Sequence, residues 1–401
     1  MMFNNIDEAL DWIQNRRNTG HTFDNFKCVC NKINNPQNDF YTIHVAGTDG
    51  KGSTVAFLRD ALMSHGFKVG TLQSPHYITH LDRIRINNVN IPESIFLSIL
   101  NKNYSFFIEN DMSMFEMDYL IMCEYFKMEK VDFAIVEVGI GGRLDATNVV
   151  DNTKLSIITT IGYDHMELLG DTLEKICFEK CGIIKNNSKI LIGHLNDECK
   201  KVVIDESRKH NAEYYELGDY IDLGDRRFIY EQQEYKITSY ADYQLHNASL
   251  AIKAFDIVCD DCDIEIDRDK LKYAIANSVW QNRFEIVKEN PRVILDGAHN
   301  IHGVEALCKS FDKFNGSKCI VFSALKRKEY IKMVEMLKEH ADELIITSFA
   351  NYGVIDLEEF AEYNTCDSYI DAIDYAIKNY DNILICGSLY FLSDVVLNYK
   401  F

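Results

Sequence analysis

The sequence has no long run of basic residues, and its 62 acidic and 42 basic residues give a net charge of −20. Nucleic-acid surfaces concentrate lysine and arginine to neutralise phosphates, so this charge balance predicts no nucleic-acid partner. No apolar run reaches the ~18 residues that a membrane-spanning helix needs, and the first residues lack the basic and apolar regions of a signal peptide. We therefore expect a cytoplasmic protein without a membrane partner.

The sequence also lacks a disulfide framework. Its 12 cysteines are scattered, and the motif from Cys259 to Cys262 has no second pair of cysteines or histidines that would complete a zinc site. Such thiols fit a reducing compartment. The length of 401 residues, with 47% hydrophobic and 26% charged residues, predicts a folded protein of two or three domains.

What the sequence does contain is a phosphate-binding loop. Residues 41–46 form a short apolar strand, which is followed by the glycine-rich residues 47–54 and by an amphipathic helix. Glycines let backbone N–H groups surround phosphate oxygens, and the helix N-terminus adds a positive dipole. Lys51 would lie between the β- and γ-phosphates, and the Ser53 hydroxyl would bind Mg²⁺. The glycine spacing is two residues shorter than in the common Walker loop, so an ordinary glycine-rich turn is the alternative.

Polar residues follow a second predicted strand, at residues 67–72. This strand leads to Ser74-Pro75-His76 and then to residues 81–87, which alternate apolar and polar side chains and include Arg83 and Arg85. Ligands of α/β proteins bind at the carboxyl ends of strands, which favours a binding role. A solvated edge strand is the simpler interpretation of this segment taken alone. Helices are expected next, at about 93–109 and 115–129.

A third strand, at residues 131–138, carries a carboxylate that suits a metal. Four apolar residues precede Glu137, so the strand would be buried in a parallel sheet with Glu137 at its carboxyl end, facing Mg²⁺. The glycines of residues 139–148 would allow close backbone approach. Arg143 and Asp145 would supply polar contacts beside the metal.

Two residues of the next segment are candidates for the same site. His165 lies in a loop after a predicted strand at 154–160, where a neutral imidazole could bind a second Mg²⁺, although a lone loop histidine usually has no such role. Lys180 lies on a helix predicted at about 172–183, where a lysine is ordinarily solvated.

The C-terminal part of the sequence predicts a separate domain. A helix at 242–258 carries Gln244 and Asn247, and a new series of strands and helices begins after residue 289. The strands, at 293–296, 319–322, 344–347 and 383–386, alternate with helices as in a small, mostly parallel Rossmann-like domain. Its first loop carries Asp296 and His299. The expected fold class is α/β, with a P-loop ATPase domain built on a mostly parallel sheet at 1–289 and a Rossmann-like domain at 290–401.

Taken in order, these motifs resemble the folylpolyglutamate synthase/dihydrofolate synthase family, which consists of two-domain members of the Mur ligase superfamily. The resemblance runs from about Pro36 to Tyr390 and rests on residues 47–54, 74–76, 137–148, 164–172, 179–185 and 296–300. It implies an ATP- and Mg²⁺-dependent, ADP-forming ligase. Such an enzyme adds L-glutamate to a folate, to dihydropteroate, or to both, through an acyl phosphate.

The resemblance also implies roles for individual residues. Contacts with ATP are expected from Gly47, Thr48, Gly50, Lys51, Gly52, Ser53, Thr54, Asn247, Arg283, Asp296 and His299. Two Mg²⁺ sites are expected to use Ser53, Glu137 and His165. Catalytic roles are implied for Lys51, His165 and Lys180, and Lys180 matches a lysine that can be carbamylated. Substrate contacts are expected from Ser74, Pro75, His76, Arg143 and Asp145. The resemblance further implies a monomer in which both domains complete the site and domain closure gates it.

Four residues depart from the family pattern. Asp49 stands where Asn is usual, and it would weaken ATP binding unless it points away or pairs with a cation. Tyr119 stands where Thr is frequent, at a position expected to touch the pterin pocket. Tyr243 stands where His is frequent, at a position expected to touch the adenine pocket. Ile301 replaces the usual Pro.

Other functions fit the sequence less well. A cell-wall Mur ligase would have a longer segment before Gly47, and a non-catalytic relative would not need to keep Lys51, Glu137 and His165. A small-molecule kinase would leave residues 296–300 unexplained. The nearest alternative is a related Mur-type amide ligase that acts on a different carboxylate acceptor.

Overall fold

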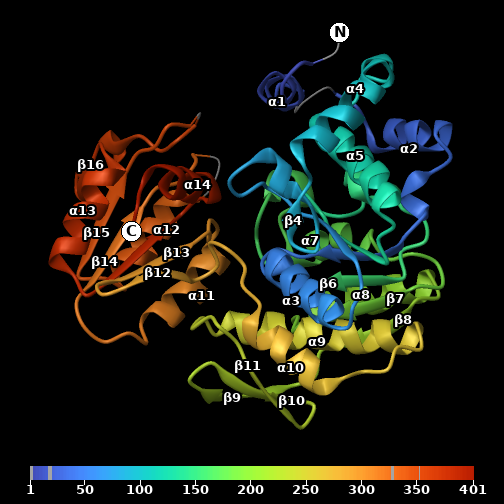
Figure 1. Cartoon of the computed structure of the whole chain (residues 1–401). Helices are drawn as coiled ribbons and strands as arrows, with labels where there is room; N and C mark the ends of the chain where they lie inside the picture. Colours follow the sequence, from blue (N-terminus) through green and yellow to red (C-terminus); the bar gives the residue numbers. More distant parts are fainter. Residues whose placement is uncertain (1–2, 17–19, 327–328, 352) are drawn as a thin grey trace. The chain divides into compact units, whose positions relative to one another are not determined.

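The computed structural model describes residues 3–16, 20–326, 329–351 and 353–401, and it contains two compact units. The first unit consists of Met1–Ile221, Ile229–Tyr235 and Asn247–Ser278, and the second of Asp222–Phe228, Lys236–His246 and Val279–Phe401. Both units are α/β, as expected from the sequence (Figure 1). Among the described residues, no helix combines the length and apolar character needed to cross a membrane.

The first unit is built on an eight-stranded sheet in the order β4-β3-β2-β5-β1-β6-β7-β8. Its strands are β1 Tyr41–Ala46, β2 Val69–Leu72, β3 Ile84–Ile86, β4 Val89–Asn90, β5 Phe133–Glu137, β6 Leu155–Ile158, β7 Lys189–Ile192 and β8 Glu213–Glu216. The central strand β1 pairs in parallel with β5 and β6. Strand β3 is antiparallel to both β2 and β4. A smaller sheet has the order β11-β10-β9, with β9 at Tyr220–Gly224, β10 at Arg227–Tyr230 and β11 at Gln233–Lys236.

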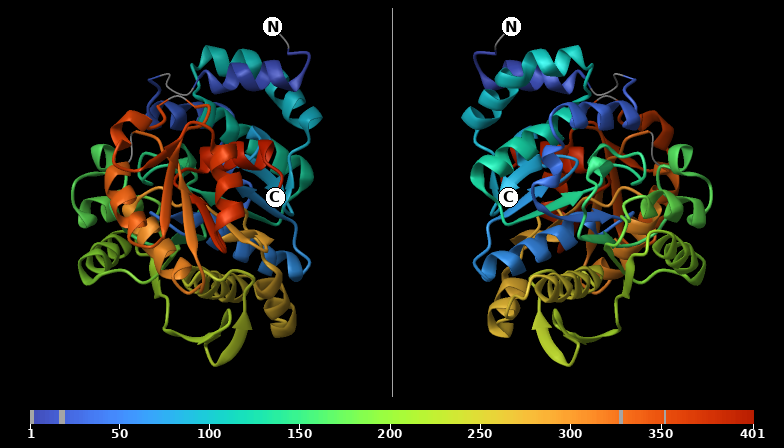
Figure 2. Two further views of the ribbon diagram at one scale, coloured as in Figure 1. Left: turned by 90° about the vertical axis from the view of Figure 1, so that its left-hand side faces the viewer. Right: turned by 90° about the vertical axis from the view of Figure 1, so that its right-hand side faces the viewer.

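Helices cover both faces of the eight-stranded sheet. They are α1 Ile6–Gln14, α2 Phe23–Lys32, α3 Lys51–Ser64, α4 Glu93–Glu109, α5 Met114–Glu129, α6 Met166–Leu169, α7 Leu173–Cys181, α8 Asp197–Lys209, α9 Tyr243–Asp261 and α10 Arg268–Asn277. In Figure 1, α1, α2, α4 and α5 lie on one side of the sheet, and α9 and α10 lie on the other. Figure 2 shows α1 beside α4. The core between these helices and the sheet is apolar and buried, and it includes Phe96, Tyr119, Phe126, Leu72 and Val136.

Short 3-10 turns connect several of these elements. They are η1 Pro36–Asn38, η2 His80–Arg83, η3 Ala146–Val149 and, in the second unit, η4 Leu357–Phe360.

The second unit is built on a six-stranded sheet in the order β12-β13-β17-β14-β15-β16. Its strands are β12 Glu285–Glu289, β13 Arg292–Asp296, β14 Lys318–Phe322, β15 Glu343–Thr347, β16 Asn364–Cys366 and β17 Asn382–Cys386. Only the β12–β13 pair of this sheet is antiparallel. Its helices are α11 Ile301–Phe311, α12 Tyr330–Lys338, α13 Tyr369–Asn379 and α14 Leu389–Asn398. Alternate strand residues face two separate apolar cores, as the pleat requires: Ile294 and Ile320 face one, Val293 and Val321 the other.

The structure confirms most of the expected elements and corrects some. Helices α4 and α5 match the expected ranges. Helices α2 and α10 and strand β12 were not expected. The interpretation of residues 81–87 as a solvated edge strand is wrong, because Arg83 and Arg85 are buried. The domain boundary at 289/290 stays a prediction.

Candidate active site

The glycine-rich loop lies at the carboxyl end of the central strand. Strand β1 ends at Ala46, and α3 begins at Lys51 with Gly50 as its N-cap, at φ 82°. Gly47 has φ 151°, and a Cβ atom there would lie 1.9 Å from Thr159 Oγ1. A Cβ at Gly50 would lie 2.4 Å from Asn247 Oδ1. Both positions therefore require glycine, and Asn247 lies against the loop.

Two threonines at the end of β6 hold this loop in place. Thr159 Oγ1 donates to the Asp49 carbonyl over 2.5 Å, and Thr160 Oγ1 donates to the same carbonyl while accepting from Asp49 N over 3.0 Å. Thr48 and Gly162 exchange two further hydrogen bonds, of 3.1 and 3.0 Å. The loop is thus fixed by side chains more than 100 positions away. The sequence alone gave no signal for Thr159 and Thr160.

Two lysines converge on one carbonyl of the loop. Lys51 Nζ donates to the carbonyls of Gly47 and Thr48 over 3.2 Å each, and Lys180 Nζ donates to the Gly47 carbonyl over 2.9 Å. Lys180 is buried, contrary to the solvated position that is usual for a helix lysine. Burial, and then the charge of Lys51, lower the pKa of Lys180 to about 7.

Asp49 adds a negative charge close to these cations. Its charge, with that of Asp164, opposes the lowering of the Lys180 pKa, so the carboxylate interacts electrostatically with Lys180. Whether Asp49 weakens ATP binding stays a prediction.

The residues expected to bind metal lie on neighbouring elements. Glu137 ends β5, where the parallel pairing aligns it with Val45 of β1, and Ser53 is buried in the first turn of α3. In the described ranges, no cluster of three or more His, Cys, Asp or Glu residues forms a metal site by itself. One carboxylate and one hydroxyl beside a phosphate loop fit Mg²⁺, which usually takes its other ligands from phosphates and water.

His165 occupies a left-handed position just before α6, with φ 51°. Its side chain is 28% exposed, and its ring nitrogens lie 3.8 Å from carboxylate oxygens of Asp164 and Glu167. Its place in a metal site stays a prediction.

The segment after Glu137 is locked to β1 by a buried chain of hydrogen bonds. Asp145 Oδ1 accepts from the Thr147 hydroxyl over 2.5 Å and Oδ2 accepts from Ile140 N over 3.0 Å. The Thr147 hydroxyl has one proton, which goes to Asp145, so it accepts the bond from His44 Nε2, 2.8 Å away on β1. Burial, and then the charge of Lys185, lower the pKa of His44 to about 3, and the ring is neutral. Burial raises the pKa of Asp145, which these hydrogen bonds oppose.

The same segment packs tightly on the end of α7. Arg143 N donates to the Glu179 carbonyl over 2.8 Å, and its half-exposed guanidinium pairs with the Glu179 carboxylate at 2.8 Å. A Cβ at Gly182 would lie 2.3 Å from Arg143 Cα, and one at Gly142 would lie 2.8 Å from the Glu179 carbonyl oxygen. This contact fixes Lys180 relative to the segment.

The loop with Ser74, Pro75 and His76 follows β2. Its continuation is held by Asp82, whose carboxylate accepts from the backbone N–H groups of Tyr77, Ile78 and Thr79 over 2.7 to 3.1 Å. The rings of His76 and His80 lie 5.8 Å apart. Tyr119 is buried in the apolar core, and its contact with the pterin pocket stays a prediction.

In the second unit, polar residues gather at the end of β13. The Asp296 carboxylate accepts from the Tyr243 hydroxyl over 2.5 Å and from the N–H groups of Phe284 and Ala298 over 2.8 Å each. Burial raises the pKa of Asp296, and the nearby Arg283 opposes the rise. His299 Nδ1 lies 2.8 Å from the Gly297 carbonyl oxygen. Arg283, Asp296 and His299 are therefore brought together, and Tyr243 belongs to the same cluster.

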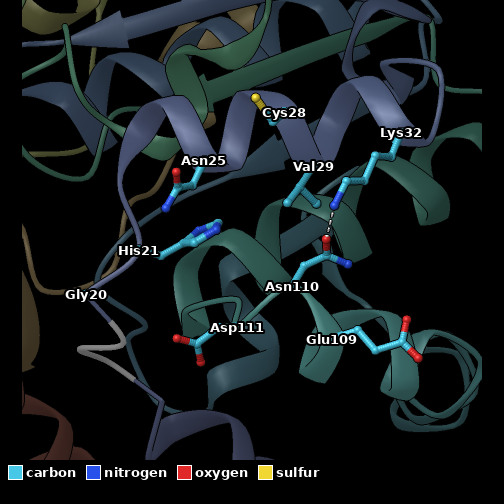
Figure 3. Close-up of a pocket in the computed structure, with 9 residues that line it drawn as sticks. All are labelled: Gly20, His21, Asn25, Cys28, Val29, Lys32, Glu109, Asn110 and Asp111. Carbon is cyan, nitrogen blue, oxygen red and sulfur yellow. Dashed lines mark hydrogen bonds between the residues drawn. The ribbon is translucent and has the colours of Figure 1, made fainter.

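A surface pocket of about 400 Å³ lies elsewhere, between α2 and the end of α4 (Figure 3). Its lining includes His21, Cys28, Lys32 and Asp111, and Lys32 Nζ donates to Asn110 Oδ1 over 2.6 Å. None of its lining residues was predicted to belong to the site.

Comparison with protein-family models finds two matches along the chain. Residues 45–254 match the Mur ligase middle domain, and residues 282–389 match the glutamate ligase domain of Mur ligases.

Whole proteins and solved structures agree with these matches. The chain is 32% identical to dihydrofolate synthase/folylpolyglutamate synthase of Bacillus subtilis, over 98% of this chain and 99% of that protein. It is 30% identical to the Escherichia coli enzyme of the same name, over 89% and 86% of the two chains. The structure of E. coli FolC in complex with DHPP and ADP is 27% identical and superimposes with a TM-score of 0.88, over 98% and 97% of the chains. The fold also matches Mycobacterium tuberculosis folylpolyglutamate synthase, at 23% identity and a TM-score of 0.87 over 98% of each chain.

Proposed function

The chain belongs to the Mur ligase family, in the branch of dihydrofolate synthases and folylpolyglutamate synthases, and we propose that its loop at residues 47–54 is where ATP activates the acceptor. The enzyme is an ADP-forming ligase that uses ATP and Mg²⁺ to add L-glutamate to a folate, to dihydropteroate, or to both. The observation that supports the proposed site best is the convergence of Lys51 and Lys180 on the Gly47 carbonyl, at the end of the central strand.

The chemistry demands positive charge at this loop. An oxygen of the acceptor carboxylate bonds to the γ-phosphorus of ATP as the bond to ADP breaks, which gives an acyl phosphate. The amino group of L-glutamate then attacks the acyl carbon and loses a proton, and phosphate leaves as the amide forms. Phosphoryl transfer depends on positioning and charge neutralisation more than on a covalent protein group. We propose that Lys51 and the N–H groups of residues 47–54 supply both.

Residues of the second unit are proposed to contact the nucleotide as well. Arg283, Asp296 and His299 belong to one cluster, and the Asp296 carboxylate is oriented by Tyr243 and by two backbone N–H groups. Asn247, which lies against Gly50, is proposed as an adenosine-side contact. The division into domains at 289/290 is part of the same proposal.

Ser53 and Glu137 would hold one Mg²⁺, and His165 with Glu137 a second. When bound, these ions neutralise charge on the phosphates. The burial of Ser53 and Glu137 beside the loop supports the first site. Lys180 is proposed to carry a carbamate, because an amine with a pKa of about 7 is partly neutral at physiological pH, and only the neutral amine reacts with CO₂.

For the substrates we propose contacts from Ser74, Pro75, His76 and Arg143. Arg143 keeps a half-exposed guanidinium despite its pairing with Glu179. Asp145 is proposed for the same pocket, although the structure commits its carboxylate to the loop backbone and Thr147, so we expect it to act by shaping the loop. We also propose that the enzyme is a cytoplasmic monomer without nucleic-acid or membrane partners. The thiol state of all 12 cysteines is consistent with a reducing compartment, and sedimentation velocity measures the oligomeric state.

Phosphate release tests the function. The wild-type protein is supplied with ATP, Mg²⁺ and L-glutamate, and with dihydropteroate, dihydrofolate or tetrahydrofolate. We expect release that depends on a pterin acceptor, and the acceptor that supports it distinguishes a dihydrofolate synthase from a folylpolyglutamate synthase. Lys51→Ala should lower turnover at least ~100-fold, because it removes charge at the transferring phosphoryl group.

The matched control is Lys209→Ala, which removes an exposed lysine of α8 and should keep wild-type turnover. Near-normal turnover in Lys51→Ala would contradict the proposed role of the loop. If ATP binds and no pterin supports release, the enzyme acts on a different carboxylate acceptor.

A further inference from the structure

Three arginines of the first unit are almost fully buried, namely Arg59, Arg83 and Arg85. Burying a guanidinium is costly unless its N–H groups find acceptors. Arg59 meets this requirement, since it donates to both Asp60 carboxylate oxygens and to Asn88 Oδ1 over 2.7 to 2.9 Å. Arg85 donates to Asn90 Oδ1 over 3.0 Å and lies 3.9 Å from Asp82.

Arg83 differs from the other two. Within the described part of the chain, the one polar contact of its side chain is an approach of Nε to Asp118 Oδ2 at 3.8 Å, beyond hydrogen-bond distance. The residue is 5% exposed, Nε is buried, and the terminal nitrogens are not among the buried polar atoms. Arg83 thus has four terminal N–H groups, and no described residue accepts a hydrogen bond from them.

The carboxylate of Asp118 balances the charge of Arg83. Asp118 is fully buried on α5, and its other oxygen, Oδ1, lies 2.7 Å from His80 Nε2. Its carboxylate is close enough to attract the guanidinium but leaves the terminal N–H groups unused. A salt bridge that served only the fold would be expected to close to hydrogen-bond distance.

Arg83 also lies at the edge of the sheet that carries the phosphate loop. Its carbonyl accepts from Gln73 N over 2.9 Å, and the Gln73 side chain donates to the Gly52 carbonyl over 3.3 Å. Leu72 pairs with Val136, so the next residues, Gln73 and Glu137, end neighbouring parallel strands. Arg83 is therefore two hydrogen bonds away from the phosphate loop.

We propose that Arg83 binds a carboxylate of a substrate. This inference rests on the proposed function, because the two substrates of that reaction both carry carboxylates. A guanidinium presents a planar fork that matches a carboxylate with two parallel hydrogen bonds. The carboxylate belongs either to L-glutamate or to the pterin acceptor, and the same experiment distinguishes the two sources.

The test compares Arg83→Gln and Arg83→Lys with the wild-type enzyme in the phosphate-release assay. For Arg83→Gln we expect the KM of one carboxylate substrate to rise about 10- to 100-fold, with the KM of ATP unchanged. A rise for L-glutamate assigns the carboxylate to the incoming amino acid, and a rise for the acceptor assigns it to the pterin substrate. Arg83→Lys keeps the charge opposite Asp118 but loses the fork, so it should fold normally and show a smaller rise. If Arg83→Gln does not fold, Arg83→Lys carries the test.

Two controls separate binding from structure. Arg59→Gln removes a fully paired buried arginine, and it should lower thermal stability while the KM values of L-glutamate and acceptor stay the same. Binding of 6-methylpterin, which has no carboxylate, should be equal in wild type and Arg83→Gln. Unchanged KM values in folded Arg83 variants would overturn the proposal, and so would an equal loss of 6-methylpterin binding, which would mark a pterin contact. A wild-type protein without pterin-dependent release would instead refute the proposed function, and ligand-induced shifts in Tm would still show whether Arg83 binds L-glutamate.

Discussion

Lys180 is a lysine held where its charge is poorly solvated. Burial, and secondarily Lys51, lower its pKa from 10.5 to about 7, while Asp164 and Asp49 limit the fall. The charged form therefore opposes folding. This penalty is fully present below pH 7 and is relieved as pH rises from about 7 toward 10.5, where the unfolded lysine also loses its proton. The same titration decides when the amine is free to react.

Lys180 should form a carbamate whose amount increases as pH rises through about 7, because CO₂ reacts with the neutral amine. The measurement is a ¹³C NMR spectrum in ¹³C-bicarbonate at pH 6, 7 and 8. Lys180→Met should remove the signal. Lys185 is the control, since it is half-buried and has a pKa lowered to about 8. A signal that survives in Lys180→Met and disappears in Lys185→Met would assign the carbamate to Lys185 and contradict the prediction.

His165→Ala should weaken the dependence of turnover on Mg²⁺ concentration, because the proposed second metal site loses its imidazole. Turnover is measured over a Mg²⁺ titration at saturating ATP. The control is His210→Ala, which changes the half-buried C-cap residue of α8. Superimposable Mg²⁺ curves for wild type and His165→Ala would remove His165 from the metal site.

Single residues were predictable from sequence where the chemistry is local. The glycines and Lys51 of the phosphate loop lie within eight positions, so a single stretch of sequence predicts them. Thr159, Thr160 and His44 were not predicted, because each acts through partners about 100 positions away. The sequence also could not predict that the terminal N–H groups of Arg83 have no acceptor among the described residues, because this depends on how distant segments pack around the side chain.

At the scale of elements, residues 139–148 and the end of α7 behave as one piece. Backbone-to-backbone contact between them depends on Gly142 and Gly182, and Asn148 Nδ2 donates to the carbonyls of Arg143 and Gly182 over 3.1 and 3.0 Å. Because α7 also carries Lys180, displacement of this contact would move an ammonium group of the proposed site.

Gly182→Ala should lower the free energy of unfolding by about 1–3 kcal/mol, because its Cβ would meet Arg143 Cα at 2.3 Å and backbone must shift. Urea unfolding followed by circular dichroism measures the effect. Gly218→Ala is the matched control, because a Cβ there has one neighbour, 4.0 Å away on Tyr230, so it should leave stability nearly unchanged. Equal free energies of unfolding for the two variants would contradict the prediction, because they would show that the backbone around Gly182 shifts at no cost.

Element boundaries were predicted well where the pattern of apolar residues was regular. Strands β5, β14, β15 and β17 and helices α4 and α5 follow from such patterns. Helix α2 was missed, although its buried residues Phe26, Val29 and Cys30 recur at the spacing of a helix face. Residues 81–87 look like a solvated edge strand in sequence, and only the packing of α5 shows that their arginines are buried.

At the scale of the whole molecule, the chain divides into two units that each have their own sheet and cores. The two-domain class was predictable, because periodicity and the resemblance both point to it. The sequence could not predict how residues 222–246 are divided between the units. Residues 222–228 and 236–246 belong to the second unit and residues 229–235 to the first, and no change in composition marks these boundaries.

Calorimetry should therefore detect more than one unfolding transition, because separate cores unfold as separate cooperative units. A non-hydrolysable ATP analogue with Mg²⁺ should raise the transition of the first unit, which holds the phosphate loop. Lys51→Ala should reduce that shift. One two-state transition, with equal calorimetric and van't Hoff enthalpies, would contradict this expectation.

The position of β1 in its sheet also sets an order of events for a chain made from its N-terminus. Ala46 pairs with Ile158, which is 112 positions later, and the threonines that hold the loop follow Ile158. In an emerging chain β1 can pair with β5 once residue 137 has been made, but its other edge stays unpaired until β6 follows, and an exposed apolar strand edge is prone to aggregation. The phosphate loop is therefore translated long before the residues that hold it. A chain truncated before Thr159 would lack the two threonine hydroxyls that bond to the Asp49 carbonyl.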